Sequence, residues 1–166
     1  MLLWLAACGS STPVVYTEDD LLEDMAGYTA WQQPAAWNGL VPSCDEAHGT
    51  YVRVYLNDIA AEDFAKDGHF REGALVVEAA FQDLSGTPKM LVAARKVTGY
   101  APAHGDWFQA MLGEEGEQVQ LAGRLDVCLS CHNDTDGWVR TRGTTPPLSL
   151  ADCPEDTTVF DSGIAF

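Results

Sequence analysis

The amino-acid sequence predicts a predominantly antiparallel β fold of the α+β class, with one twisted sheet and a few short helices. Residues 51–56 alternate along the chain and are mostly β-branched or aromatic, as in a strand. Two further strands, 75–81 and 90–95, are separated by a Ser-Gly-Thr-Pro turn. Residues 107–112 and 118–121 flank a Gly-Glu-Glu-Gly turn, which predicts a hairpin. A chain of 166 residues has the length of one domain.

Short helices and loops account for the residues before and between these strands. Thr17 is expected to cap a helix over 18–25, and Asn57 with Asp58 is expected to cap a second helix over 59–66. The stretch 28–45 contains two tryptophans, two prolines and a glycine. This composition predicts a loop that packs aromatic side chains onto the domain.

The composition is that of a globular protein with an unusually acidic surface. Hydrophobic residues make up 46% of the chain, and the formal net charge is −16. The sequence has no apolar run of the roughly 18 residues that a membrane-spanning helix needs. The charge repels nucleic acid and anionic lipid, and it favours small molecules or basic partner proteins. Simple solubility explains the same charge equally well.

Cys128, Cys131 and His132 form a C-x-x-C-H motif, the attachment signature of a c-type haem. The two thiols can form thioether bonds with the porphyrin, and the adjacent imidazole then becomes an axial ligand of the iron. The alternatives are half of a zinc site, a redox pair or chance. A zinc site would need a second pair of ligands and a redox pair a βαβ pattern, and the sequence shows neither. We therefore predict one covalently attached haem c per chain, with His132 bound to the iron.

The beginning of the chain agrees with the exported compartment that covalent haem attachment requires. Residues 1–7 followed by Cys8 resemble a lipoprotein signal, in which Cys8 becomes the lipidated first residue. The basic region of such signals is missing, so an ordinary thiol at Cys8 stays open as an alternative. We expect residues 8–16 to be a linker and residues 17–166 to form a single haem domain. The protein would then lie on the periplasmic side of a bacterial membrane, bound to it only through the lipid.

Two cysteines remain once the lipid and the haem have been assigned. They are Cys44 and Cys153. In an oxidising compartment two such cysteines are more often paired than free, so we predict a disulfide between them. Closing a loop of this length would stabilise the fold by roughly 2 to 5 kcal/mol.

Seven short segments, spread over roughly residues 45 to 140, occur in the same order as in a known family. They are His48-Gly49, residues 55–58, residues 70–78, Gly99-Tyr100, residues 105–107, the C-x-x-C-H motif and residues 136–139. In these segments the chain resembles the cytochrome P-460 and cytochrome c′-beta family of exported mono-haem proteins. The resemblance implies a mainly antiparallel β fold, a homodimer and a haem near the C-terminal end. It also implies that His132 is the proximal ligand and that the opposite face of the iron is open to small ligands.

The family divides by chemistry. Members of the P-460 type are oxidases of hydroxylamine or nitric oxide with a lysine cross-linked to the porphyrin, whereas c′-beta members lack the lysine and bind nitric oxide and carbon monoxide. Glu78 stands where the resemblance places that lysine. Lys66 and Lys89 lie outside that context, and Lys96 on the next strand could in principle point at the haem. The resemblance therefore implies a gas-binding protein without the cross-link.

Several other residues are candidates for the haem pocket. Arg53 and Glu78 lie in strands, where each could face either the haem or the solvent, and Glu78 could there move protons. Trp107 and Phe108 could wall the pocket or fill the core. A sixth iron ligand could come from a histidine or a methionine, although exposure in loops and core filling are their commoner roles. These ligand candidates are His48, His69, His104, Met25, Met90 and Met111.

The sequence therefore predicts an exported c-type haem protein that binds a small gas, nitric oxide or carbon monoxide, at an open iron position. The first alternative is an enzyme, a haem oxidoreductase acting on hydroxylamine or nitric oxide. The second alternative is a simple electron carrier. The acidic surface would suit a basic redox partner protein, and no nucleic-acid partner is expected.

Overall fold

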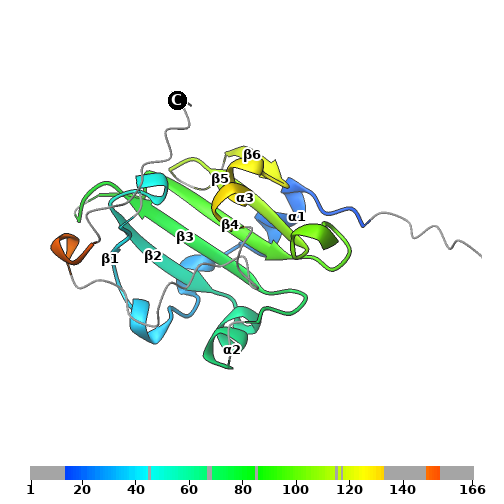
Figure 1. Cartoon of the computed structure of the whole chain (residues 1–166), viewed down its shortest axis with the longest axis horizontal. Coiled ribbons are helices and arrows are strands. Elements are labelled where there is room, and N and C mark those ends of the chain that lie inside the picture. The colour runs from blue at the N-terminus through cyan, green and yellow to red at the C-terminus, as the bar shows by residue number, and fades with distance from the viewer. Residues whose placement is uncertain are drawn as a thin grey trace, which may run out of the picture.

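The computed structural model describes residues 14–44, 46–66, 69–84, 86–114, 116, 118–132 and 149–153. Within these residues, one antiparallel sheet has six strands in the order β1-β2-β3-β4-β5-β6, so each strand pairs with its neighbour in the sequence (Figure 1). The strands are β1 (Val41–Pro42), β2 (Tyr51–Leu56), β3 (Leu75–Phe81), β4 (Met90–Lys96), β5 (Trp107–Leu112) and β6 (Val119–Gly123). The predicted antiparallel fold of the α+β class is thereby confirmed.

Three short α-helices and five 3-10 turns connect and cover the strands among the described residues. They are α1 (Glu18–Asp24), α2 (Asp58–Lys66), α3 (Asp126–His132), η1 (Tyr28–Ala30), η2 (Ala35–Trp37), η3 (Glu46–His48), η4 (Pro102–His104) and η5 (Leu150–Asp152). Thr17 caps α1 as predicted, because its hydroxyl oxygen accepts a hydrogen bond from the Asp20 backbone N–H at 3.3 Å. Asn57 Oδ1 accepts from the Ala60 backbone N–H at 2.9 Å at the start of α2. None of the described helices has the length and the apolar character to cross a membrane.

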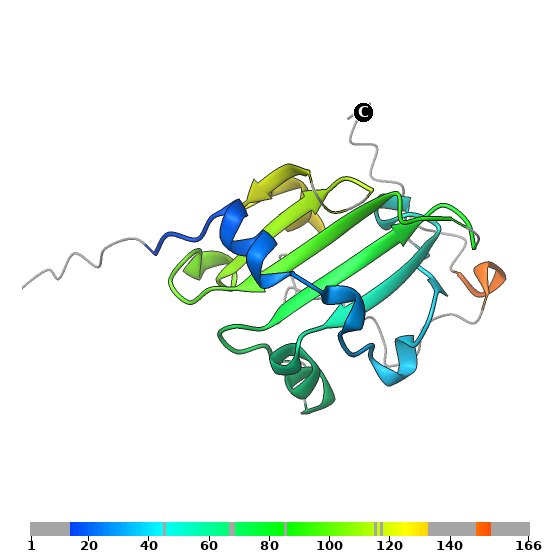
Figure 2. The same ribbon diagram turned by 180° about the vertical axis from the view of Figure 1, so that it is seen from behind.

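The two faces of the sheet carry different layers. Helix α1 crosses one face (Figure 2), and α3 lies over the other (Figure 1). Strand β3 contributes side chains to both faces of the sheet, because successive side chains of a strand point to opposite sides. Leu75, Val77 and Phe81 pack with α1, whereas Val76 packs on the side of α3.

The main core lies between α1 and the sheet. Leu21 and Met25 insert from the α1 segment against fully or nearly fully buried side chains of the strands, which are Tyr55, Leu75, Val77, Ala79, Phe81, Leu91, Ala93, Phe108, Ala110 and Leu112. Burial of a large aliphatic or aromatic side chain contributes roughly 1.5 to 3 kcal/mol. A smaller cluster on the opposite face holds α2 and α3 to the sheet. Its buried members are Leu56, Ala60, Phe70, Ala74, Val76, Trp107 and Leu129.

The region predicted as a loop, 28–45, contains more structure than expected. Val41 and Pro42 form the two-residue strand β1 against Val52 and Tyr51. Earlier in this region, Gln32 accepts a backbone hydrogen bond at 2.8 Å from Leu56 through its carbonyl oxygen. The loop prediction was therefore incomplete, because these short pairings depend on the neighbouring strand and leave no periodic pattern of their own.

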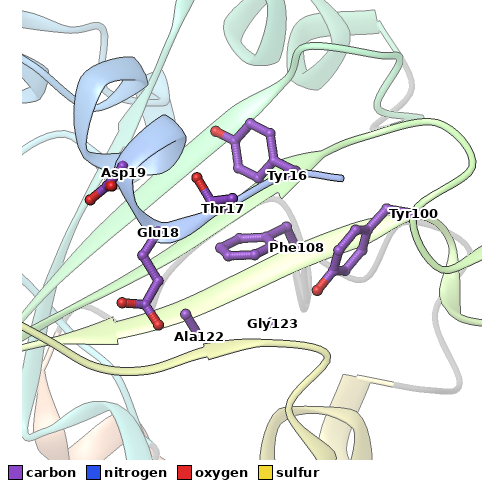
Figure 3. A pocket seen from close by; sticks show the side chains of 8 residues that line it. All are labelled: Tyr16, Thr17, Glu18, Asp19, Tyr100, Phe108, Ala122 and Gly123. Carbon is purple, nitrogen blue, oxygen red and sulfur yellow. The ribbon is translucent and has the colours of Figure 1, made fainter. Parts of the chain in front are cut away.

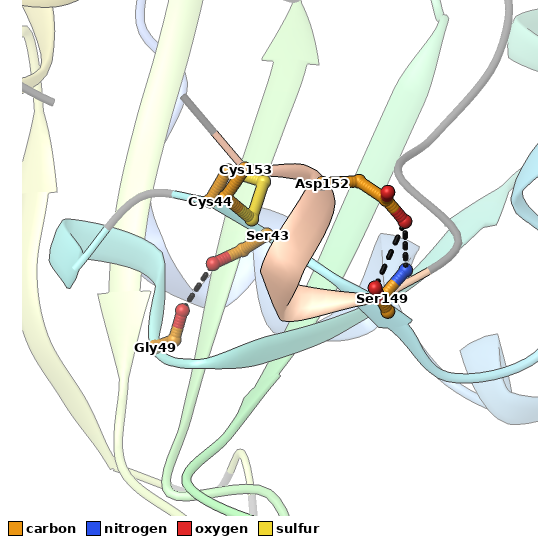
Figure 4. Close-up of a disulfide and its surroundings, with 6 residues drawn as sticks. All are labelled: Ser43, Cys44, Gly49, Ser149, Asp152 and Cys153. Atoms are coloured by element: carbon orange, nitrogen blue, oxygen red, sulfur yellow. Dashed lines mark hydrogen bonds between the residues drawn. A yellow bond between two sulfur atoms is a disulfide. The ribbon is translucent and has the colours of Figure 1, made fainter. Parts of the chain in front are cut away.

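A disulfide joins Cys44 to Cys153, the pair expected from the cysteine count (Figure 4). It links the loop after β1 to the end of η5, where the Ser149 hydroxyl and the Ser149 backbone N–H each donate to Asp152 at 2.9 Å. The predicted signal, Cys8 and the segment 136–139 lie outside the described residues. Lipidation at Cys8 stays a prediction.

Candidate functional site

The C-x-x-C-H motif lies on α3, directly after the last strand of the sheet. The amide N–H groups of Cys128 and Leu129 both donate to the carbonyl oxygen of Leu125 at 3.0 Å, which starts the helix. Positions 128, 131 and 132 are three and four residues apart, so the helix brings them to one side. Leu129 is only 9% exposed and anchors α3 in the smaller core cluster. The motif is therefore held against the sheet by a buried side chain.

A row of four directly paired residues crosses the sheet on the same face as α3. Val54 pairs with Glu78, Glu78 with Val92, and Val92 with Met111. All four are partly exposed, although the neighbouring positions of β3 are buried. The row therefore forms an apolar platform with a single carboxylate in its middle.

Glu78 makes a short contact with His48. The Glu78 Oε1 atom lies 2.5 Å from His48 Nδ1, and the two side chains are only 23% and 26% exposed. A carboxylate accepts hydrogen bonds, so the Nδ1 atom of His48 carries the proton and donates it. In the neutral imidazole this leaves the lone pair on Nε2.

His48 in turn lies next to the histidine of the haem motif. The centres of the His48 and His132 rings are 6.1 Å apart, and the ring planes are inclined by 50°. Three parts of the chain that are distant in sequence, η3, β3 and α3, therefore meet at His48, Glu78 and His132. Within the described residues, no group of three or more histidine, cysteine, aspartate or glutamate side chains is arranged to hold a bare metal ion.

The loop that carries His48 is held by three contacts. Gly49 has a φ of +81°, and a Cβ atom added there would lie 3.0 Å from the carbonyl oxygen of Phe81 on β3. The Ser43 hydroxyl donates to the carbonyl oxygen of Gly49 (Figure 4). The neighbouring Cys44 is tied to Cys153. These contacts fix the backbone on both sides of η3, and they position the His48 ring.

The Nε1 atom of Trp107 and the Oε1 atom of Gln109 lie on the α3 face, and neither has a hydrogen-bond partner among the described residues. Their side chains are 1% and 4% exposed. Lys96 lies above the same tryptophan, with its Nζ atom 5.3 Å from the ring centre, and donates to the carbonyl oxygen of Gly105. Burial lowers the pKa of Lys96. Unsatisfied buried polar atoms are rare in folded proteins, so this part of the face suits a bound group.

The other pocket and ligand candidates proposed from the sequence lie on different faces of the sheet. Arg53, one of the two pocket candidates, lies on the α1 face, because it pairs with the buried Ala79 and sits 5.7 Å from the Phe81 ring centre. Met25 and Phe108 belong to the main core on that face. Glu78 lies on the α3 face.

The remaining ligand and lysine candidates are distributed as follows. Met90 and Met111 lie on the α3 face, since they pair with Ala80 and Val92. His69 is exposed, and His104 contacts Arg124 at 2.9 Å. Lys66 pairs with Glu62 on the surface of α2.

The sequence did not reveal that His48 and Glu78 act as a pair. The sequence does single out Glu78, because it is the only polar residue between positions 75 and 81. His48 is 30 residues away in the chain, and only the folded sheet brings the two together.

A depression lies on the other face of the sheet, beside α1 (Figure 3). It has a volume of about 390 Å³ and is lined by Tyr16, Thr17, Glu18, Asp19, Tyr100, Phe108, Ala122 and Gly123. Tyr16 donates to Asp24 at 2.8 Å, and burial together with this carboxylate raises the pKa of Tyr16. The depression contains no residue of the C-x-x-C-H motif and is separated from α3 by the sheet.

Comparison with protein-family models gives no match to the chain, and comparison with curated proteins gives no significant match. The resemblance to the cytochrome P-460 and c′-beta family therefore rests on the short segments in the sequence. It stays a prediction, as does the homodimer that it implies.

Proposed function

We propose that this protein is an exported c-type haem protein that binds a small gas, nitric oxide or carbon monoxide, at the iron position opposite His132. One observation carries the proposal. The C-x-x-C-H motif lies on a helix beside the partly exposed platform of Val54, Val92 and Met111.

The residues around α3 fit a covalently bound haem. Cys128 and Cys131 are one turn apart on the helix, the arrangement in which both thiols can reach one porphyrin. His132 follows directly and would bind the iron, which supplies the position where a diatomic gas binds. The platform offers a planar macrocycle an apolar surface. The buried N–H of Trp107, which has no partner among the described residues, could donate to a haem propionate.

Gas binding suits the surroundings of the motif better than oxidation catalysis does. The apolar side chains of the platform favour a neutral diatomic molecule over an ion. The net charge of −16 discourages anionic substrates. Glu78, at the position of the family's cross-linking lysine, is a carboxylate and cannot form that bond.

Covalent attachment is tested first. The protein is expressed together with a c-type haem attachment system, denatured and extracted with acid and organic solvent. We expect the haem to stay with the chain, and we expect the double variant Cys128→Ala, Cys131→Ala to lose it. The matched control, Cys44→Ser with Cys153→Ser, also removes two cysteines and should keep the haem. Complete extraction of haem from the unmodified protein would contradict covalent attachment and with it the proposed function.

Gas binding is tested on the same preparation. Carbon monoxide or nitric oxide added to the ferrous protein should shift the optical spectrum, and His132→Ala should alter that response. A ferrous protein whose spectrum changes with neither gas would contradict the proposed function.

Electron transfer is a second candidate function. It is favoured by a second imidazole, His48, close to His132. A pure electron carrier would have two protein ligands on the iron and would be indifferent to carbon monoxide, so the same gas titration separates the two functions.

A further inference from the structure

We propose that His48 binds the haem iron opposite His132 while no gas is present, and that the gas displaces it. The inference rests on the proposed function and adds a regulation of the same iron site. The exchange breaks the bond between His48 Nε2 and the iron and forms one between the gas and the iron. No electron is transferred in this step.

The distance between the two histidines suits a shared iron. Two imidazoles that bind one metal ion from opposite sides, each through a nitrogen about 2 Å away, have ring centres roughly 6 Å apart. The rings of His48 and His132 are 6.1 Å apart. His69 is exposed, and His104 contacts Arg124, so among the described residues His48 is the histidine placed at this distance from His132.

Glu78 prepares His48 for metal binding. Histidines that bind metals commonly donate their other ring N–H to a carboxylate, which fixes the tautomer and makes the ligating nitrogen more basic. His48 Nδ1 and Glu78 Oε1 form such a contact at 2.5 Å. Nε2 is therefore the ring nitrogen that would approach the iron.

The protein holds His48 near the iron but does not bury it completely. The backbone beside it is fixed by Gly49 against Phe81 and by the hydrogen bond from Ser43. The imidazole itself is 26% exposed, and η3 is a single 3-10 turn. The ring can therefore rotate away without disturbing the sheet, as a displaceable ligand must.

Competition by His48 would set the strength of gas binding. A protein ligand that occupies the iron nine-tenths of the time lowers the apparent gas affinity about tenfold, because only the remaining fraction can bind. A gas that binds strongly enough overcomes this competition, whereas a weak ligand does not. The site would then need a gas concentration about tenfold higher to reach half-saturation than it would without His48.

The test measures the coordination state of the intact haem protein without gas. We expect the optical and magnetic circular dichroism spectra of the unmodified protein to show six-coordinate, low-spin iron with two histidines. His48→Ala should become five-coordinate and bind carbon monoxide about tenfold more tightly. Glu78→Gln should weaken the bond from His48 and leave a mixture of six-coordinate and five-coordinate iron. Added imidazole should restore six-coordination in His48→Ala. The matched control, His69→Ala on an exposed loop, should behave like the unmodified protein.

Two outcomes would overturn the inference. One is five-coordinate iron in the unmodified protein without gas. The other is a six-coordinate spectrum that survives His48→Ala, which would assign the ligand to another group, such as Met111. The near-infrared spectrum of the ferric unmodified protein identifies the axial pair directly, so the inference remains testable if His48→Ala does not fold.

These outcomes are distinguishable from failure of the proposed function. Five-coordinate iron that binds carbon monoxide would leave the gas-binding function intact and remove only the role of His48. Two histidine ligands on the iron of the unmodified protein, together with a five-coordinate His48→Ala variant that binds neither gas, would support the role of His48 and contradict the gas-binding function.

Discussion

Cys44 and Cys153 are 109 residues apart in the sequence, yet their Cα atoms lie 5.3 Å apart and a disulfide joins their sulfurs. The bond closes a loop that contains strands β2 to β6 and all of α3. It therefore restrains the unfolded chain over most of the domain.

The first prediction concerns this disulfide. The double variant Cys44→Ser, Cys153→Ser should lose about 4 kcal/mol of unfolding free energy, because a long closed loop removes much entropy from the unfolded chain. Urea titration of both proteins measures the difference. Reductant should destabilise the unmodified protein alone, and equal stability of the two proteins would contradict the prediction.

The second prediction concerns the glycine beside His48. Gly49 and Gly39 both have positive φ angles, +81° and +96°, but only at Gly49 would a Cβ atom meet other atoms within 4 Å. Gly39→Ala should cost about 1 to 2 kcal/mol for the backbone conformation alone. Gly49→Ala should cost clearly more, because the new methyl group also contacts the β3 backbone. Denaturant unfolding of both variants checks the order, and equal losses would argue against a tight contact.

The third prediction concerns alkaline pH. Burial is the largest cause that raises the pKa values of Tyr16, Tyr28 and Tyr100 in the folded protein. As the pH rises through about 10, the unfolded chain releases phenolic protons that the folded protein keeps. The folded state then binds more protons than the unfolded state, so the unfolding free energy falls with rising pH.

Lys96 opposes this trend, because its pKa is lowered in the folded protein. Between that lowered pKa and the ordinary lysine value of about 10.4, the unfolded chain binds more protons and stability rises with pH. Three tyrosines should outweigh one lysine. Urea titrations between about pH 8 and 11 should show a net loss that is smaller in Tyr16→Phe, and an unchanged slope in that variant would refute the assignment.

The fourth prediction concerns the anchoring of α3. Leu129→Ala should lower the unfolding free energy by about 2 to 4 kcal/mol, since it opens a cavity between the helix and the sheet. Val127, on the same helix, is 45% exposed and serves as the control. Val127→Ala should change stability by less than about 0.5 kcal/mol. Similar losses in both variants would mean that α3 is not held by Leu129.

Much of the sheet could be predicted because its pattern is local. Strands β2 and β3 begin and end where the sequence indicates, since alternation marks the bounds of β2 and an apolar run interrupted by Glu78 marks those of β3. Strand β1 was missed, because two residues with a proline have no pattern and depend on β2 for their pairing.

The candidate site was less accessible to sequence reasoning. Alternation shows that Arg53 shares a face with Tyr51 and Tyr55, but it does not show which face α3 covers. That choice depends on how helices distant in sequence pack on the sheet. For the same reason, the contact between His48 and Glu78 follows only from the folded chain.

The order of the strands has a consequence for how the molecule assembles. Each strand pairs with the one before it, so each pairing closes only the loop between two successive strands, and the entropic cost of closing a loop rises slowly with its length. The last residue of the described sheet, Gly123, precedes Cys128 in the chain. The disulfide of Cys44, in contrast, needs Cys153, which comes 109 residues later in the chain. The described sheet uses only residues 41–123, so its strand pairings need neither the motif thiols nor Cys153 in order to form.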